Sequence, residues 1–384
     1  MFKLITEMFH QKVEELSFTK TRHLYSSFDL RNQLTGLIGS RGVGKTTLLL
    51  QYIKNELMQD KKCFYFSANF LYFQQTTLRN LVKDLHVLEG YQMIFIDDIH
   101  KYANWDLELN TIADSFPALK IVFSGTFASH NLLKRPKLYR LHGMSFREYL
   151  NFSLDLSLQA LPFQKLLQNS LEEMPSQLFS HFENYLKHGY YPSFFKEEKI
   201  LEIIERTIFD DIANSYNLKT QNLCLFKKIL AHFANSPLGE VNVHGLAKKL
   251  EVDNKTVEHY LYILVSAGLL RELYLCEEKE DAFRKPSRFV LNNTCLMYAL
   301  QQYKEESVCK KSTRELFLVQ ALQNAGFELF YSKEGGYRTS QEIFEFNKKK
   351  KKRKLLTLPV YLVKDNILEP ASGEFPLFLA GFLQ

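Results

Sequence analysis

Short apolar runs alternate with helical patterns from residue 33 to about residue 150. The runs cover residues 34–39, 63–67, 93–96, 120–125 and 137–142. Alternation of strands with helices is typical of an α/β domain built on a parallel sheet. We therefore expect residues 1–150 to form one α/β domain, with these five runs as its strands.

The pattern changes after residue 150. Residues 151–221 are mostly helical and polar, and they are interrupted at Pro162, Pro175 and Pro192. Residues 222–291 follow the order helix, helix, helix, strand, strand, and residues 292–384 mix helices with strands. This order predicts a helical lid or linker region, then a winged-helix-like module, then a small C-terminal α/β domain.

The third helix of the winged-helix-like module has a predicted buried face and a predicted exposed face. Asn242 and Asp253 are placed to cap the second and third helices, and Gly268 to end the third. Spacing of three and four places these residues on the buried face: Val257, Tyr260, Leu261 and Leu264. The exposed face is predicted to contain Lys255, Glu258, His259, Tyr262 and Ser266. A helix that reads DNA exposes Arg, Lys, Asn or Gln, so this pattern favours packing or interaction over DNA reading.

One segment supplies the whole net charge of the chain. The net charge is +6, and residues 348–354 carry seven positive charges, so the rest of the chain sums to −1. A near-neutral body argues against a surface that coats nucleic acid. The segment lies between two strand-like stretches, which predicts the tip of a hairpin. A solvated loop is the simplest interpretation, and contact with nucleic acid or an anionic membrane surface is the alternative.

Composition narrows the class of protein further. No apolar stretch reaches 18 residues, and the first 16 residues lack an apolar run with a small-residue cleavage site. We expect neither a membrane span nor a signal peptide. The five cysteines are odd in number and include no C-x-x-C pair. Free thiols in a reducing cytoplasm are the simplest interpretation.

The strongest motif is the sequence GSRGVGKT at residues 39–46, which matches G-x-x-x-x-G-K-[ST]. An apolar strand precedes it and an amphipathic helix follows. The glycines let backbone N–H groups point at phosphate, and the helix N-terminus adds its dipole. Lys45 is expected to reach the β- and γ-phosphates of ATP, and the Thr46 hydroxyl to bind Mg²⁺. The expected nucleotide-binding residues are Gly39, Ser40, Arg41, Gly42, Val43, Gly44, Lys45, Thr46 and Thr47.

Two carboxylates follow the third apolar run. Asp97 is expected to hold Mg²⁺, and Asp98 stands where a general base or water-orienting carboxylate is needed. Asp is one methylene shorter than Glu, so we expect slow hydrolysis or a requirement for a helper. The alternative is that the pair caps the helix that follows.

The fourth run ends in polar residues. Ser124 or Thr126 is expected to contact the γ-phosphate or the attacking water, and an ordinary turn residue is the alternative for Ser124. Arg135 and Arg140 are weaker candidates for an arginine that acts on the site of another subunit.

These segments together resemble AAA-type ATP-binding proteins, close to the archaeal-ATPase group and related to STAND NTPases. The resemblance rests on GSRGVGKTTLL, IFIDDIHKYANW, KIVFSGTFAS and YRLHGMSFREYL, and continues in YLKHGYYP (185–192) and ERTIFDDIA (205–213). It implies a five-stranded core in which the Ser124 strand lies between the phosphate-loop strand and the Asp97 strand. It also implies that ERTIFDDIA opens the C-terminal domain.

Several members of this family have a nuclease-like C-terminus. Here Glu315, the stretch 341–347 and the stretch 358–364 are similar to its three hallmarks, and Lys364 is kept. Phe344 and Leu362 stand where the resemblance expects acids. Metal-dependent cleavage of phosphodiesters needs clustered carboxylates, so we expect a degenerate domain without nuclease activity.

The sequence therefore predicts a cytoplasmic protein that binds ATP and Mg²⁺, hydrolyses ATP and couples nucleotide state to its C-terminal modules, which would contact a protein partner. A nucleic-acid-binding regulator, with ATP as a switch and little turnover, is the alternative. A metabolite kinase fits less well because no acceptor site is evident beyond residue 150.

Overall fold

The computed structural model describes residues 2–16, 20–57, 63–69, 73, 75–129, 131–168, 174–194, 197–235, 238, 241–276, 288–302, 309–332, 336–346 and 358–384. Contacts divide the chain into two compact units. The first comprises Met1–Gly143 and Glu205–Leu223, and the second comprises Met144–Ile204 and Cys224–Gln384. The chain thus leaves the first unit after residue 143 and returns to it for residues 205–223.

The first unit is built on a five-stranded parallel sheet. Its strands are β1 (Leu34–Ile38), β2 (Cys63–Ser67), β3 (Met93–Asp97), β4 (Lys120–Gly125) and β5 (Lys137–Arg140). They lie in the order β2-β3-β4-β1-β5, and every pair is parallel. Strands β1, β2, β3 and β4 are almost wholly buried, as expected for a sheet covered on both faces. All five predicted strands are confirmed, and β4 lies between β1 and β3 as the resemblance implied.

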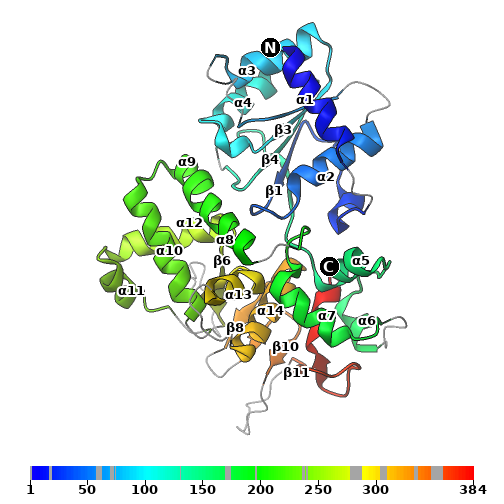
Figure 1. The fold of residues 1–384 in the computed structure, drawn as a ribbon, viewed down its shortest axis with the longest axis vertical. Helices are drawn as coiled ribbons and strands as arrows, with labels where there is room; N and C mark the ends of the chain where they lie inside the picture. The colour runs from blue at the N-terminus through cyan, green and yellow to red at the C-terminus, as the bar shows by residue number, and fades with distance from the viewer. Residues whose placement is uncertain are drawn as a thin grey trace. The chain divides into compact units, whose positions relative to one another are not determined.

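Helices cover both faces of this sheet (Figure 1). Helices α1 (Phe2–Glu14) and α2 (Lys45–Tyr52) lie on one face, and α3 (Leu78–Lys83) and α4 (Trp105–Ser115) lie on the other. Strand-to-strand connections in parallel sheets are right-handed, so a chain that reverses its direction across the sheet changes face. The returning segment adds the π-helical turn η8 (Thr207–Ile212) and α9 (Ala213–Tyr216), and α9 contacts the short helix η6 (Ile99–Lys101) that follows β3.

The second unit begins with helices, as predicted for this part of the chain. They are α5 (Phe146–Leu154), α6 (Phe163–Gln168), α7 (Leu178–Asn184), the π-helical turn η7 (Tyr185–Gly189) and α8 (Glu197–Arg206). The Ser145 side chain accepts from the Glu148 N–H, and the Glu148 carboxylate accepts from the Ser145 N–H, so a capping box starts α5. A side chain at Gly189 would lie 2.4 Å from the Tyr185 ring. The segments MSFREYL and YLKHGYYP therefore serve packing within this unit.

Three further helices follow, α10 (Thr220–Asn235), α11 (Val243–Leu250) and α12 (Asn254–Ser266). The Asn242 and Asp253 side chains cap α11 and α12 by accepting the N–H groups of Gly245 and Thr256. The buried face predicted for α12 is confirmed at all four positions. Strands β6 (Leu270–Leu275) and β7 (Arg288–Leu291) form an antiparallel pair after α12. This is the predicted order of elements, and a winged-helix role stays a prediction.

A seven-stranded sheet, in the order β12-β11-β10-β9-β8-β6-β7, runs through the rest of this unit. Its remaining strands are β8 (Phe330–Tyr331), β9 (Tyr337–Arg338), β10 (Ile343–Glu345), β11 (Val360–Lys364) and β12 (Glu374–Pro376). Helices α13 (Thr294–Gln302), α14 (Lys310–Asn324) and η9 (Leu377–Phe382) complete it. Strand β6 pairs with both β7 and β8, so one sheet lies on both sides of the boundary predicted at residues 291 and 292.

The prediction of a hairpin around the lysine-rich segment is wrong. Strands β10 and β11, which flank it, are parallel, with Ile343 level with Val360. A hairpin would make them antiparallel, whereas parallel neighbours need a crossover connection of about a dozen residues or more. Residues 348–354 themselves lie outside the described residues.

Candidate functional site

The loop of residues 39–44 joins β1 to α2 at the carboxyl edge of the first sheet. Gly42 and Gly44 have φ angles of 85° and 98°, in the region that favours glycine. A Cβ atom at Gly39 would lie 2.3 Å from the Leu141 carbonyl oxygen. These glycines therefore allow a tight turn whose backbone leads directly into the N-terminus of α2, the arrangement that binds phosphate.

Lys45 is buried at the start of α2. Its Nζ donates to the carbonyl oxygens of Gly39, at 2.7 Å, and Ser40, at 3.0 Å. Burial lowers the pKa of the Lys45 ammonium, and the charges of Asp98 and Asp97 act in the opposite direction. A buried ammonium whose hydrogen bonds go to the carbonyl oxygens of its own loop is suited to a phosphate, which would supply a directly bonded counter-charge.

Asp97, at the end of β3, collects three hydroxyl groups. Its Oδ2 accepts from Thr46 Oγ1 at 2.6 Å and from Tyr65 OH at 2.8 Å, and its Oδ1 accepts a short hydrogen bond from Ser124 Oγ. The carboxylate is 3% exposed. A carboxylate beside a threonine hydroxyl is a set of hard oxygen ligands, and Mg²⁺ prefers such ligands. Thr46 and Asp97 therefore fit the magnesium ion of a bound nucleotide.

Asp98 has a different environment from Asp97. Its φ angle is 53°, and its side chain, 32% exposed, accepts from Lys101 Nζ at 2.7 Å. Its side chain makes no capping bond to the helix that follows. Burial raises the pKa of the Asp98 carboxyl, but Lys101, then Lys45, lower it more, and the net pKa is below its usual value. Asp98 is thus ionised at neutral pH and is suited to orienting a water molecule.

The two polar residues at the end of β4 and directly after it, Ser124 and Thr126, have different partners. Ser124 is fully buried, donates to Asp97 and accepts from the Asp98 N–H at 3.2 Å. Its hydroxyl therefore holds the carboxylate of Asp97 and the backbone of Asp98. Thr126 Oγ1 instead lies 3.2 Å from an oxygen of Asp211, in the returning segment.

Asp211 is the main residue of this edge that the sequence motifs did not reveal. It accepts from Arg41 Nε at 3.2 Å and, more closely, from a second nitrogen of the same guanidinium. His100 Nε2 lies 3.3 Å from Asp211 Oδ1, the oxygen that this second nitrogen of Arg41 also contacts. Burial raises the pKa of the Asp211 carboxyl, but His100 and Arg41 lower it far below its usual range. The sequence did contain a signal for a buried Asp211. At helical spacing it falls on the apolar stripe of Ile204, Ile208 and Ile212, where a carboxylate needs partners.

Arg22 was also missed by the sequence analysis. Its side chain is 5% exposed and donates to the carbonyl oxygens of Val43, at 2.6 Å, and His142, at 2.9 Å. Arg22 therefore holds the loop of residues 39–44 to the segment that follows β5. An isolated arginine outside any motif gives no such signal in the sequence.

The two arginine candidates lie near β5. Arg140 ends that strand, level with Ile38 and one residue short of the loop, and its side chain is exposed. Arg135 is exposed in the segment before β5.

The nuclease-like residues of the second unit do not form a carboxylate cluster. Phe344 is fully buried, and its ring packs against Phe163, Tyr361 and Phe375 with centroids 5.5 to 6.1 Å apart. Lys364 pairs with Glu374 at 3.8 Å. Burial raises the pKa of Glu315 on α14. Among the described residues of the whole chain, no group of three or more His, Cys, Asp or Glu side chains is arranged to hold a metal ion.

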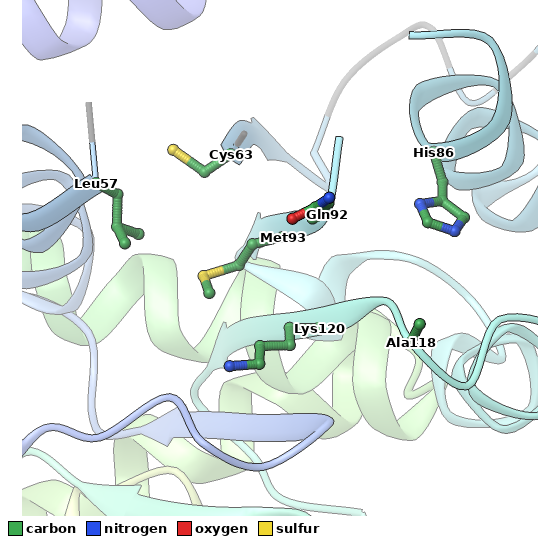
Figure 2. Close-up of a pocket in the computed structure, with 7 residues that line it drawn as sticks. All are labelled: Leu57, Cys63, His86, Gln92, Met93, Ala118 and Lys120. Atoms are coloured by element: carbon green, nitrogen blue, oxygen red, sulfur yellow. The ribbon is translucent and has the colours of Figure 1, made fainter. Parts of the chain in front are cut away.

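A cavity of about 520 Å³ lies at the opposite edge of the first sheet, where β2, β3 and β4 begin (Figure 2). Leu57, Cys63, His86, Gln92, Met93, Ala118 and Lys120 line it. Burial raises the pKa of the Cys63 thiol to about 11, so this cysteine is protonated at neutral pH. All five cysteines lie in the described part of the chain, and none forms a disulfide.

Two family descriptions match parts of this chain. Residues 31–150 match the family described as AAA domain, and residues 179–307 match a domain of unknown function, DUF8612. No curated protein matches the chain significantly. Helices long and apolar enough to cross a bilayer are absent from the described residues.

Solved structures with distant similarity include two from named organisms. One is a STAND protein with a tetratricopeptide repeat sensor from Pyrococcus horikoshii, with 14% identity, 80% of this chain covered, 45% of that chain covered and a TM-score of 0.31. The other is DnaA from Aquifex aeolicus with AMPPCP bound, with 13% identity and a TM-score of 0.28. The similarity covers 67% of this chain and 86% of the DnaA chain. This chain spans less than half the length of the first.

Proposed function

We propose, from the premise that residues 31–150 form an AAA-type P-loop domain, that the protein binds ATP with Mg²⁺, hydrolyses it slowly and uses the nucleotide state to act on its second unit. The Thr46–Asp97 hydrogen bond supports this proposal most directly. It joins the two motifs that the chemistry requires, although 51 positions separate them in the sequence.

Each residue of the edge has a separate task in the proposed reaction. Backbone N–H groups of residues 39–44 and the N-terminus of α2 would hold the phosphates, and Lys45 would neutralise them. Thr46 and Asp97 would hold Mg²⁺, which neutralises charge that develops on the phosphate oxygens. Ser124 keeps Asp97 in place through its short hydrogen bond.

Asp98 would orient the attacking water. Its lowered pKa makes it a weak base, because a proton taken at neutral pH would be held poorly. Its ion pair with Lys101 also restrains the carboxylate. Slow turnover, increased by a partner that releases Asp98 from Lys101, is the consequence.

Calorimetric titration of ATP and Mg²⁺ into the full chain tests the proposal. Wild type should bind ATP, and Lys45→Ala should lose about 10- to 100-fold in affinity, because a charged hydrogen-bond donor to phosphate is removed. Lys3→Ala is the matched control, since Lys3 is an exposed lysine on α1 whose side chain is 90% exposed. Equal affinities for the two lysine variants would refute the assignment of the loop.

Nucleic acid as the partner is the competing proposal. The exposed face of α12 contains one positive side chain, Lys255, and one negative side chain, Glu258. Their charges cancel, so this face attracts phosphate weakly. Electrophoretic mobility shift of nucleic acid with and without ATP, beside a turnover assay, separates the two: nucleic-acid binding that depends on ATP with little turnover would favour the regulator.

A further inference from the structure

Asp211 brings the returning segment to the proposed phosphate-binding edge. Its carboxylate is 1% exposed and faces Arg41, His100 and Thr126, which follow β1, β3 and β4 respectively. The carboxyl ends of neighbouring parallel strands meet at one edge, so three loops converge on a single carboxylate. A buried carboxylate requires such partners, because desolvation of an unpaired charge is costly.

The three partners are groups that bind phosphate. Arg41 offers its guanidinium and Thr126 its hydroxyl. The Thr126 N–H lies 3.4 Å from His100 Nδ1, which assigns the ring proton to Nε2, the nitrogen that faces Asp211. A guanidinium, an imidazole N–H and a hydroxyl can all donate to a phosphate oxygen as they do to a carboxylate.

This carboxylate also acts on the P-loop lysine. The charges of Asp211 and Arg41 both influence the pKa of Lys45, the residue expected to reach the β- and γ-phosphates. Two anions brought to this edge repel each other, and the repulsion is stronger where water is partly excluded. The Asp211 carboxylate and a terminal phosphate would therefore compete for the same donors.

We propose that Asp211 is a γ-phosphate-sensing residue: a nucleoside triphosphate takes Arg41 and His100 away from its carboxylate, and a diphosphate leaves the contact in place. This inference rests on the proposed function. Asp211 is then a specificity-determining residue that separates the triphosphate-bound state from the diphosphate-bound state.

The position of Asp211 in the chain connects the proposed sensing of the γ-phosphate to the second unit. Residues 205–223 are connected at both ends to the second unit, through Ile204 and Cys224. Release of Asp211 frees η8 from its buried ion pair, and the change is passed along the chain in both directions. No contact between the two units is required for this coupling.

A positioning role for Asp211 predicts the opposite change in triphosphate affinity. If Asp211 only positioned Arg41 for the phosphate, removal of its charge would weaken triphosphate binding. If it competes with the phosphate, removal of its charge strengthens triphosphate binding. The sign of the change decides between them.

The test is calorimetric titration of a non-hydrolysable ATP analogue and of ADP, each with Mg²⁺, into wild type and Asp211→Asn. We expect the ratio of the ADP dissociation constant to the analogue dissociation constant to rise at least 10-fold in Asp211→Asn. Asp84→Asn is the matched control, an exposed carboxylate on the same unit, and its ratio should equal that of wild type. An unchanged or lower ratio in Asp211→Asn would overturn the sensor.

Two further measurements keep the result clear. In an Arg41→Gln background, addition of Asp211→Asn should raise the ratio less than it does in wild type, because only His100 is then left for the phosphate to take from the carboxylate. An equal rise in both backgrounds would contradict the role of Arg41. Amide hydrogen exchange of residues 205–216 in wild type should speed up with the analogue and stay unchanged with ADP. Identical exchange with both nucleotides would overturn the sensor even if Asp211→Asn did not fold.

Failure of the sensor differs from failure of the proposed function. Wild type that binds neither nucleotide refutes the ATP-binding function itself. Wild type that binds both, with no effect of Asp211→Asn on the ratio, refutes only the sensor.

Discussion

The Thr46 hydroxyl donates a hydrogen bond of 2.6 Å to the Asp97 carboxylate and so joins the first turn of α2 to the end of β3. The hydroxyls of Tyr65 and Ser124 and the N–H of Asp98 also donate to that carboxylate. The arrangement presents a hydroxyl and a carboxylate to the same point, and the first prediction concerns the metal expected there.

Thr46→Ala should remove the dependence of ATP binding on Mg²⁺. The hydroxyl is one of two protein ligands expected for the ion, so its loss leaves Asp97 alone. ATP affinity measured by calorimetry with Mg²⁺ and with EDTA should differ in wild type and agree in Thr46→Ala. Thr111→Ala removes a hydroxyl that bonds only within α4, and should behave as wild type.

Asp98→Asn should keep ATP bound and lower hydrolysis about 100-fold, because the amide cannot accept a proton and orients water less well. Turnover and affinity measured on one preparation separate these effects. Asp84→Asn is again the exposed control. Equal turnover in wild type and Asp98→Asn would place the water-orienting group elsewhere.

Lys101→Gln should move the acid limb of the pH–turnover profile to higher pH. Lys101 is the largest influence that lowers the pKa of Asp98, so its removal raises that pKa. The carboxylate would then be lost at a higher pH than in wild type as the pH falls. An unshifted limb would show that Asp98 does not govern turnover.

The Asp211 contact should stabilise the first unit in a pH-dependent way. Its pKa is lowered on folding, so the stabilisation is present above the unfolded-state pKa of about 4 and is lost as pH falls below it. Asp211→Asn should cost about 1–3 kcal/mol at pH 7, because Arg41 loses a charged partner. The difference in melting temperature from wild type should shrink between pH 4 and pH 3.

Charged groups near Asp211 also affect how the difference in melting temperature between wild type and Asp211→Asn depends on pH. They are Arg41, His100, Asp210, Asp98 and Lys45. Repeating the pH series in His100→Gln removes the contact of the imidazole with Asp211 from the comparison. A difference that stays constant down to pH 3 in both backgrounds would contradict the buried ion pair.

Phe344→Ala should destabilise the second unit by about 3–5 kcal/mol, the usual cost of removing a fully buried ring. The ring is the common neighbour of Phe163, Tyr361 and Phe375. Leu368→Ala is the control, since Leu368 is 56% exposed and should change stability by less than about 0.5 kcal/mol. Urea denaturation compares them, and equal midpoints would contradict the packing role.

Replacement of residues 348–354 by Gly and Ser should leave ATP turnover intact and reduce any binding to nucleic acid. The rest of the chain sums to −1, so it has little long-range attraction for phosphate. Each phosphate contact on duplex DNA contributes a log–log salt slope of about −0.9. Equal slopes for both forms would show that the segment makes no phosphate contacts.

The sequence predicted the local features of both units well. Five strands, the phosphate loop between β1 and α2, and the caps at Asn242 and Asp253 follow from contiguous patterns. Each depends on residues within a few positions of one another, and such signals survive without knowledge of the rest of the fold. The roles of Lys45, Asp97 and Asp98 were predicted from motifs, and they remain predictions for their chemistry.

The sequence did not predict where distant segments meet. The direction of β11 beside β10 was predicted incorrectly, because strand-like composition does not encode strand direction. Ser124 or Thr126 was expected to contact the γ-phosphate or the attacking water, which stays a prediction; the bonds of Ser124 to Asp97 and of Thr126 to Asp211 were not predicted. The segment ERTIFDDIA was expected to open the C-terminal domain of unknown function, and the match to such a domain at residues 179–307 includes it; its contacts with the first unit were not predicted.

What the sequence determined by itself is therefore the local structure of each short segment: a glycine-rich turn between a strand and a helix, and apolar strands for a buried sheet. Phosphate binding by the turn and cation binding by the oxygen ligands stay predictions. Tertiary structure alone decided that Asp211 meets Arg41, its partner 170 positions away in the sequence. The physical reason is that a buried charge can take its partner from any part of the chain that folding brings near, and side-chain periodicity shows only that a partner is needed.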